Sequence, residues 1–162
     1  MNGNSHTSDD ALLLASFALG DAVFGIDAQQ IQEVAKVGEI TPARHAPACV
    51  IGIRNLRGRV ITVLDLRIRL ELGAVQIGHD SRVLIVEGEG GEPVGLLVDR
   101  VDDMIAVNPK DIMAAPPNMN GVKNRNLRGV FRGGKRLVAV LDLASVLHTD
   151  LGEGLTQEKL TA

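Results

Sequence analysis

The residues that could bind a metal or act as nucleophiles are scattered along this 162-residue sequence. None of the four histidines has a His or Cys partner at the spacing of metal ligands. They are His6, His45, His79 and His148. Three serines lie in or beside apolar segments without the G-x-S-x-G pattern of a nucleophile elbow, and they are Ser16, Ser81 and Ser145. The sequence therefore predicts no catalytic residue, no metal site, no cofactor and no enzymatic activity.

A glycine-rich run, Glu87-Gly88-Glu89-Gly90-Gly91-Glu92, resembles a phosphate-binding loop only superficially. It contains no Lys-Ser/Thr pair, no helix is expected to follow it, and its three carboxylates would repel a phosphate. We interpret this run as the tip of a hairpin.

A dense basic cluster occupies the middle of the chain and comprises Arg54, Arg57, Arg59, Arg67 and Arg69. Such a cluster could bind nucleic acid. Small β-barrels that bind RNA or single-stranded DNA usually stack bases on aromatic side chains, but this chain has three Phe and no Trp or Tyr. The favoured interpretation is a basic patch that faces solvent or a protein, with Asp99, Asp102 and Asp103 as an acidic counterpart. A nucleic-acid-binding β-barrel is the alternative of another class.

The elements that position these residues occur twice in the chain. The tetrapeptide Asn55–Gly58 recurs as Asn126–Gly129, and the strand pattern Val60–Leu66 recurs as Leu137–Leu143. The two offsets differ by six residues, which we assign to a longer hairpin turn over residues 131–136 of the second copy. Upstream, the segment from Gly25 matches the segment from Gly95. Two copies are too few for a solenoid, so the repeat predicts paired subdomains.

Apolar runs separated by turn residues predict about ten short strands joined by hairpins, with single helical turns after Asp27 and Asp65. Without a long helix, this pattern predicts an all-β fold of two small barrels. We expect a first lobe over residues 11–72 and a second lobe over residues 80–149, with a linker between them. Residues 1–10 and 150–162 are polar and are expected to be tails.

The composition favours a soluble cytoplasmic protein with an aliphatic core. Apolar residues make up 45% of the chain, aromatic residues make up 2%, and the net charge is −3. The single cysteine, Cys49, cannot form an internal disulfide, which is consistent with a reducing compartment. No apolar run approaches the roughly 18 residues of a membrane span. The first ten residues contain no Lys or Arg and do not resemble a signal peptide.

Several of these motifs together resemble the CheW coupling proteins of bacterial chemotaxis. The first half contributes Phe17-x-Leu19-Gly20-Asp21, Gly25-Ile26-Asp27, Ile31-x-Glu33-Val34, Gly52-x-x-Asn55-Leu56-Arg57-Gly58 and Leu64-Asp65-Leu66-Arg67. The second half contributes Val98-Asp99-x-Val101 and Leu141-Asp142-Leu143. The resemblance covers residues 12–148, and the Asn-Leu-Arg-Gly element between the other segments is its most specific part.

The resemblance implies two five-stranded SH3-like barrels related by pseudo-symmetry, with short helices. It also implies a non-catalytic adaptor that couples the histidine kinase CheA, through its regulatory domain, to the cytoplasmic tip of a chemoreceptor. Such an adaptor would be associated with the inner membrane only through the receptor. We expect it to be monomeric alone and to join arrays or rings with the kinase. A coupling protein of a pilus or other chemosensory system remains an alternative.

The matching positions imply a set of partner-binding residues, to which the repeat adds Val101 as the counterpart of Ile31. They are Ile31, Glu33, Val34, Gly52, Arg57 and Val101. Apolar members of this set would bury side chains of receptor helices. Glu33 and Arg57 could pair with each other or reach a partner, and Arg57 could instead brace its own hairpin.

Overall fold

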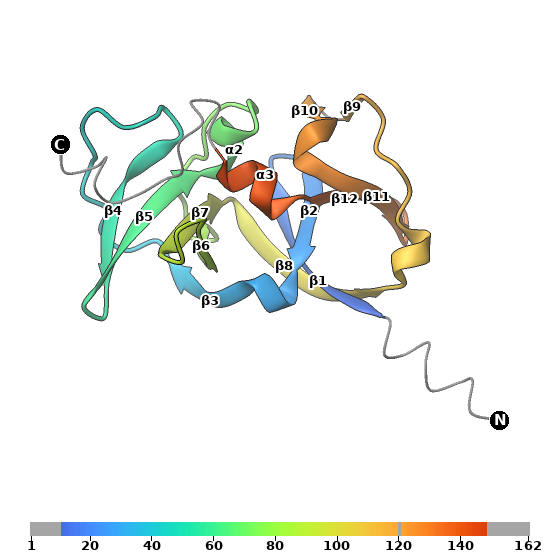
Figure 1. Ribbon diagram of the computed structural model, residues 1–162, viewed down its shortest axis with the longest axis horizontal. Coiled ribbons are helices and arrows are strands. Elements are labelled where there is room, and N and C mark those ends of the chain that lie inside the picture. The colour runs from blue at the N-terminus through green and yellow to red at the C-terminus, as the bar shows by residue number, and fades with distance from the viewer. Residues whose placement is uncertain (1–10, 120, 149–162) are drawn as a thin grey trace.

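The computed structural model describes residues 11–119 and 121–148, and its regular elements are mostly strands (Figure 1). The β4 sheet has the order β3-β6-β7-β5-β4 and comprises β3 (Ile31–Lys36), β4 (Val50–Leu56), β5 (Arg59–Asp65), β6 (Arg82–Glu87) and β7 (Pro93–Val98). The β11 sheet has the order β11-β12-β2-β1-β8 and comprises β1 (Leu12–Leu19), β2 (Ala22–Asp27), β8 (Arg100–Val107), β11 (Leu127–Gly133) and β12 (Arg136–Leu141). The all-β prediction is confirmed. The expected tails lie outside the described residues.

The remaining elements are short. They are η1 (Ala28–Gln30), η2 (Pro109–Asp111), η3 (Asn124–Asn126), α2 (Leu66–Arg69), α3 (Leu143–Leu147) and a two-stranded pair of β9 (Asn118–Met119) with β10 (Val122–Lys123). The predicted turn after Asp27 and helix after Asp65 are both present. Each begins with an aspartate whose carboxylate accepts a hydrogen bond from a backbone N–H, of Gln29 and of Ile68 respectively.

Each sheet takes a hairpin from the other half of the chain. The β6–β7 hairpin joins the β4 sheet through a parallel pairing of β7 with β5, in which Val63 lies opposite Gly95. The β1–β2 hairpin joins the β11 sheet through a parallel pairing of β2 with β12, in which Val140 lies opposite Gly25. The expected division into lobes over residues 11–72 and 80–149 therefore does not describe the sheets. Neighbouring segments usually pair with each other, and no local pattern indicates this exchange.

The repeat is present, but one part of its predicted alignment is wrong. The β4–β5 and β11–β12 hairpins match at a single offset of 77 residues without an insertion, and their bulges and strand pairs coincide: Gly52 with Val63, and Gly129 with Val140. Gly52 is thus the counterpart of Gly129. The second Asn-Leu-Arg-Gly element begins its strand, whereas Arg57 and Gly58 of the first form the hairpin turn. The β4–β5 and β11–β12 turns both contain two residues, so the two copies differ in the type of turn and not in its length.

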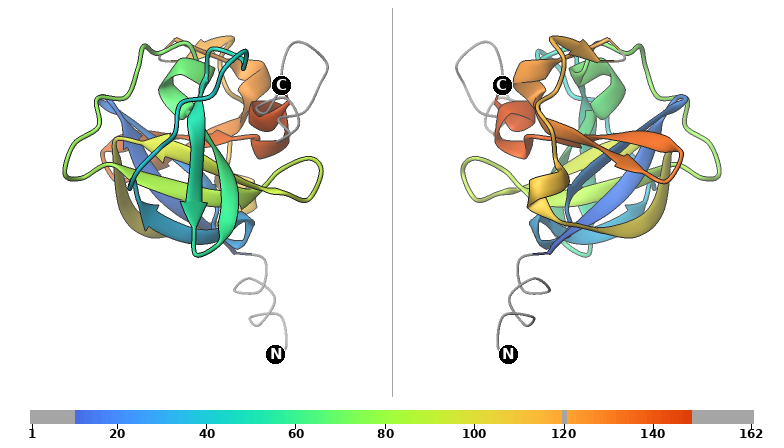
Figure 2. Two further views of the ribbon diagram at one scale, coloured as in Figure 1. Left: turned by 90° about the vertical axis from the view of Figure 1, so that its left-hand side faces the viewer. Right: turned by 90° about the vertical axis from the view of Figure 1, so that its right-hand side faces the viewer.

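The main hydrophobic cluster draws aliphatic side chains from both sheets, including Leu64 and Leu96 from one and Ile26 and Leu141 from the other. Phe17 and Phe24 stack within it. The end-on views show the strands curving around this interior (Figure 2). The helices α2 and α3, which follow the β4–β5 and β11–β12 hairpins respectively, lie next to each other on the same side of the molecule (Figure 1). This shared core fixes the two sheets relative to each other.

Candidate functional site

Five of the six predicted partner-binding residues lie on or beside outer strands, and the turn that follows β4 holds the sixth. Strand β3 carries Ile31, Glu33 and Val34. Gly52 lies in β4, Arg57 lies in the β4–β5 turn, and Val101 lies in β8. Strands β3, β4 and β8 are edge strands, because each pairs with only one strand of its five-stranded sheet, although Thr41 of the preceding loop bridges β4 at Ile53.

Ile31 and Val101 occupy equivalent places, as the repeat predicted. Ile31 pairs with Val86 at the start of β3, and Val101 pairs with Phe17 near the start of β8. Both side chains are half-buried and pack against the same main cluster from different sheets. The two residues therefore border the junction between the sheets, although the sequence places them 70 residues apart.

Glu33 and Arg57 form an ion pair between β3 and the β4–β5 turn. Strands β3 and β4 lie at opposite edges of their sheet, so the pair bridges strands that share no ladder. Arg54 makes a second bridge by donating a hydrogen bond to the carbonyl of Lys36 at 2.8 Å. The Arg57 side chain is still 69% exposed. The geometry thus supports the pairing that the sequence left open, and it leaves the guanidinium accessible.

Gly52 has a steric reason to be glycine. The residue is buried, and a Cβ placed on it would lie 2.1 Å from the carbonyl oxygen of Thr41. Thr41 and Ile53 exchange two backbone hydrogen bonds of 2.8 Å, which hold the loop before β4 against that strand. Gly52 therefore permits a close approach of two backbone segments. Its direct contact with a partner stays a prediction.

Val34 combines an apolar side chain with 46% exposure on an outer strand. It follows Glu33 directly in β3, so the two side chains point to opposite faces of the sheet. An exposed apolar side chain on an edge strand suits a protein contact.

Most of the predicted basic cluster is engaged within the protein. Besides Arg54 and Arg57, Arg67 donates hydrogen bonds to the carbonyl of Leu72 and lies 3.4 Å from the carboxylate of Asp99. Arg69 donates to three backbone carbonyls at the end of α3. These contacts favour a structural role over a nucleic-acid-binding stripe.

The predicted acidic counterpart is also partly engaged. Asp99 accepts hydrogen bonds from the backbone N–H of Gly20 and from Arg67, and Asp102 pairs with Arg100 at 2.8 Å. Asp99 is thus paired with one of the clustered arginines, Arg67, within the same chain.

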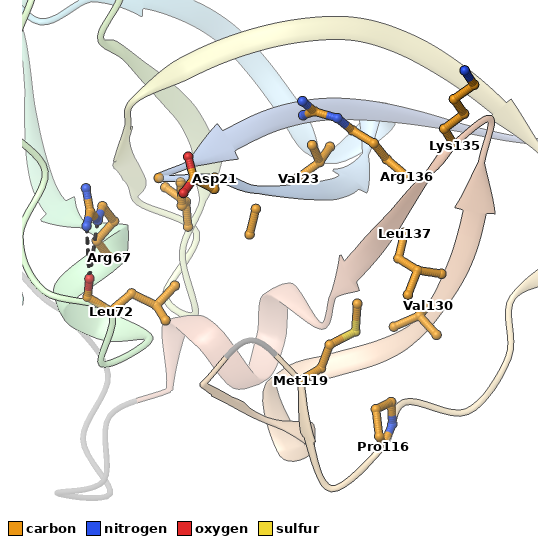
Figure 3. A pocket seen from close by; sticks show the side chains of 13 residues that line it. Asp21, Val23, Arg67, Leu72, Pro116, Met119, Val130, Lys135, Arg136 and Leu137 are labelled. Atoms are coloured by element: carbon orange, nitrogen blue, oxygen red, sulfur yellow. Dashed lines mark hydrogen bonds between the residues drawn. The ribbon is translucent and has the colours of Figure 1, made fainter.

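An open groove that the sequence did not predict lies between the β1–β2 turn, α2 and the start of β12 (Figure 3). We call it the hairpin groove, and it has a volume of about 1000 Å³. Its lining residues are Leu19, Gly20, Asp21, Ala22, Val23, Arg67, Leu72, Pro116, Met119, Val130, Lys135, Arg136 and Leu137. None of the six predicted partner-binding residues lines it. Its walls come from four separate segments, so no local sequence signal could have revealed it.

Comparison with known proteins decides the family. The model of the CheW-like domain matches residues 14–151. The chain belongs to the CheW-like family. It is 32% identical over 151 residues to the chemotaxis protein CheW of Rhizobium meliloti (strain 1021), covering 92% of this chain and 96% of that protein. It is 30% identical over 136 residues to the protein FrzA of Myxococcus xanthus, covering 82% and 83%.

A solved CheW structure has the same fold. The crystal structure of the scaffolding protein TtCheW from Thermoanaerobacter tengcongensis matches with a TM-score of 0.81 and 28% identity, covering 90% of this chain and 92% of that one. The resemblance inferred from the motifs is thus confirmed. Within the described ranges, no helix is long and apolar enough to cross a membrane, and no group of three or more His, Cys, Asp or Glu is placed to hold a metal ion.

Cys49 of this CheW-like chain is expected to react slowly with thiol reagents at pH 8. The residue is 8% exposed, and burial raises the pKa of its thiol, although the nearby charge of Arg69 acts in the opposite direction. A raised pKa lowers the thiolate fraction at a given pH, and the thiolate is the reactive species. Mass spectrometry after timed alkylation should show slow labelling of the native protein and rapid labelling in denaturant. Equal rates in both would contradict the buried position.

Proposed function

We propose that this chain is the coupling protein of a chemosensory array, in which it joins the histidine kinase CheA to the cytoplasmic tips of chemoreceptors. The observation that carries the proposal is the match to the CheW-like family over nearly the whole chain, together with the shared fold of a scaffolding protein. The arrangement of the predicted residues supports it, because they lie on strand edges and at the junction of the sheets. A cytoplasmic location at the inner membrane, through the receptor, belongs to the same proposal.

The receptor contact is proposed at the junction bordered by Ile31 and Val101. Both side chains are apolar, half-buried and continuous with the core, so a receptor helix could add apolar side chains to an existing cluster. Val34 would extend the apolar contact, because it lies on the same face of the sheet as Ile31. Glu33 with Arg57 would add a polar contact on the opposite face of β3. The kinase's regulatory domain would bind the outer end of a sheet.

Two alternatives differ in the partners they require. A coupling protein of a pilus or other chemosensory system would have the same fold, and one relative, FrzA, carries a different name from the CheW proteins. A nucleic-acid-binding barrel is disfavoured because four of the five clustered arginines contact groups of this chain. Retention of the protein on immobilised RNA, falling steeply as the salt concentration rises, would favour the nucleic-acid-binding barrel.

The deciding experiment is co-sedimentation of the full chain with receptor-bearing membranes, with and without the kinase. Coupling predicts that the chain sediments with receptors and that it increases the amount of kinase in the pellet. Membranes without receptor provide the control for non-specific adsorption. A chain that stays in the supernatant with cognate receptors and kinase would contradict the proposal.

Arg57→Glu is expected to weaken coupling by roughly tenfold to a hundredfold while leaving the fold intact. Lost charge-assisted hydrogen bonds to a partner cost about 1.5–3 kcal/mol. The exposed pair with Glu33 contributes only about 0–1 kcal/mol to stability, so little change in the thermal midpoint is expected. The matched control is the charge swap Glu33→Arg/Arg57→Glu, which restores the pair. Full recovery of coupling in the swap would show that Arg57 acts by bracing β3 and not by touching a partner.

The chain alone is expected to be monomeric and to form larger species with the kinase's regulatory domain. Two similar sheets at opposite ends offer two contact surfaces to a partner of the same design, and head-to-tail contacts close into rings when the rotation allows. Light scattering of the chain, alone and mixed with that domain at low and high salt, measures this. A tight, salt-insensitive homodimer that does not grow with the kinase domain would contradict the scheme.

A further inference from the structure

The hairpin groove has an apolar floor and a basic rim. Leu72, Met119 and Leu137 contribute apolar side chains, while Lys135 and Arg136 stand at the start of β12 (Figure 3). Leu137 is 47% exposed, which is high for a large aliphatic side chain in a strand. The groove therefore combines apolar surface in contact with water and positive charge at one margin.

The charge at this margin is not neutralised by the described residues. Within residues 11–119 and 121–148, neither Lys135 nor Arg136 forms an ion pair. Arg67, by contrast, is already held by Asp99 on the opposite wall. Asp21 is the one carboxylate among the lining residues. An occupant complementary to this groove carries aliphatic side chains for the floor and carboxylates for Lys135 and Arg136.

The segment that follows the described chain has this composition. Residues 149–162 have the sequence T-D-L-G-E-G-L-T-Q-E-K-L-T-A, with three leucines and three carboxylates against one lysine. The leucines are Leu151, Leu155 and Leu160, and the carboxylates are Asp150, Glu153 and Glu158. The acidic residues alternate with the leucines, so one short segment can present both kinds of side chain.

The segment also starts close enough to reach the groove. Its anchor, His148, is fixed by a hydrogen bond of 2.7 Å from Arg69 to its carbonyl. Arg69 belongs to the same four-residue helix as Arg67, which lines the groove. Fourteen extended residues span up to about 46 Å, several times the length of that helix.

We propose that residues 149–162 dock in the hairpin groove of the same molecule, with leucines on the apolar floor and carboxylates at Lys135 and Arg136. Tethering gives the segment an effective concentration of the order of mM, so even a weak contact is populated. The docked segment covers apolar surface that a partner could otherwise use. The site is separate from the six proposed partner-binding residues, so the proposal goes beyond the coupling function and does not depend on it.

A spin label on the segment tests the proposal in the full chain. Thr156→Cys introduces a thiol for the label without removing a leucine of the segment, and the native Cys49 is buried. The label is expected to broaden the methyl NMR signals of Leu19, Leu72 and Leu137 in the groove. The methyl signals of Ile61 and Val83, in the separate cluster of the β4 sheet, should stay sharp. Broadening that is absent, or centred away from the groove, would overturn the proposal.

Two variants of equal charge change test the role of the basic rim. Lys135→Glu/Arg136→Glu is expected to abolish the broadening, while Arg44→Glu/Arg59→Glu, at exposed positions outside the groove, should preserve it. Broadening that survives in the first variant would overturn the proposed contact. A mixture of spin-labelled chains with isotope-labelled chains that lack the spin label shows whether the occupant comes from the same molecule or from a second copy. Broadening in that mixture would show that a second copy, and not the same molecule, fills the groove.

Discussion

Gly52→Ala is expected to lower the thermal midpoint by roughly 2–12 °C. The added Cβ would lie 2.1 Å from the Thr41 carbonyl oxygen and 2.8 Å from the Ile40 side chain, so the backbone must move. Overpacking of this kind costs about 1–3 kcal/mol, and each kcal/mol lowers the midpoint of a domain of this size by about 2–4 °C. The two hydrogen bonds between Thr41 and Ile53 should weaken with the shift. Thermal unfolding followed by far-UV circular dichroism measures the effect.

Two further glycines sharpen this prediction. Gly129 is the counterpart of Gly52, and its Cβ would lie 2.4 Å from the Met113 carbonyl oxygen, so Gly129→Ala should cost a similar amount. Gly78→Ala is the matched control, because a Cβ there meets nothing within 4 Å. If Gly52→Ala melts like Gly78→Ala but still fails to couple kinase to receptor, the steric account is wrong and Gly52 lies in a contact surface.

The local elements of this fold could be predicted from the sequence because their causes are local. The two-residue turn at Gly20-Asp21 and the aspartate caps at Asp27 and Asp65 each depend on residues within a few positions. The exchange of hairpins could not be predicted. It depends on parallel pairing of β5 with β7 and of β12 with β2, in which the partners come from different halves of the chain.

The candidate site was predictable to the extent that the repeat was aligned correctly. The offset of 70 residues, carried by β3 and β8, made Val101 the counterpart of Ile31, and their common packing confirms that equivalence. The Asn-Leu-Arg-Gly element misled the alignment, because in the first copy it ends a strand and forms the hairpin turn, whereas in the second copy it begins a strand. At the position of Arg57 the second copy has Gly134, so the ion pair with Glu33 has no counterpart.

Arg69→Ala is expected to destabilise α3 more than any other helix or strand. The guanidinium donates to the carbonyls of Val146, Ser145 and His148 at 2.7, 3.0 and 2.7 Å, groups that a helix leaves without internal partners at its end. Losing hydrogen bonds from a charged donor costs about 1.5–3 kcal/mol, or roughly 3–12 °C in thermal midpoint. Arg69→Lys keeps the charge but lacks the planar guanidinium group, so its thermal midpoint should lie between those of Arg69→Ala and the unchanged protein. Arg59→Ala, at an exposed position, is the control.

The asymmetry of this contact makes the prediction specific. Because Arg69 follows β5 and α3 follows β12, the side chain fastens a helix of the β4 sheet to a helix of the β11 sheet. The counterpart of Arg69 is Val146, which is fully buried, so no reciprocal contact supports α2. Amide hydrogen exchange in Arg69→Ala should therefore accelerate at α3, roughly tenfold to a hundredfold, and much less at α2, whose cap on Asp65 is retained. Equal acceleration of exchange in both helices would contradict this prediction, because it would mean that Arg69 stabilises the whole fold and not α3 in particular.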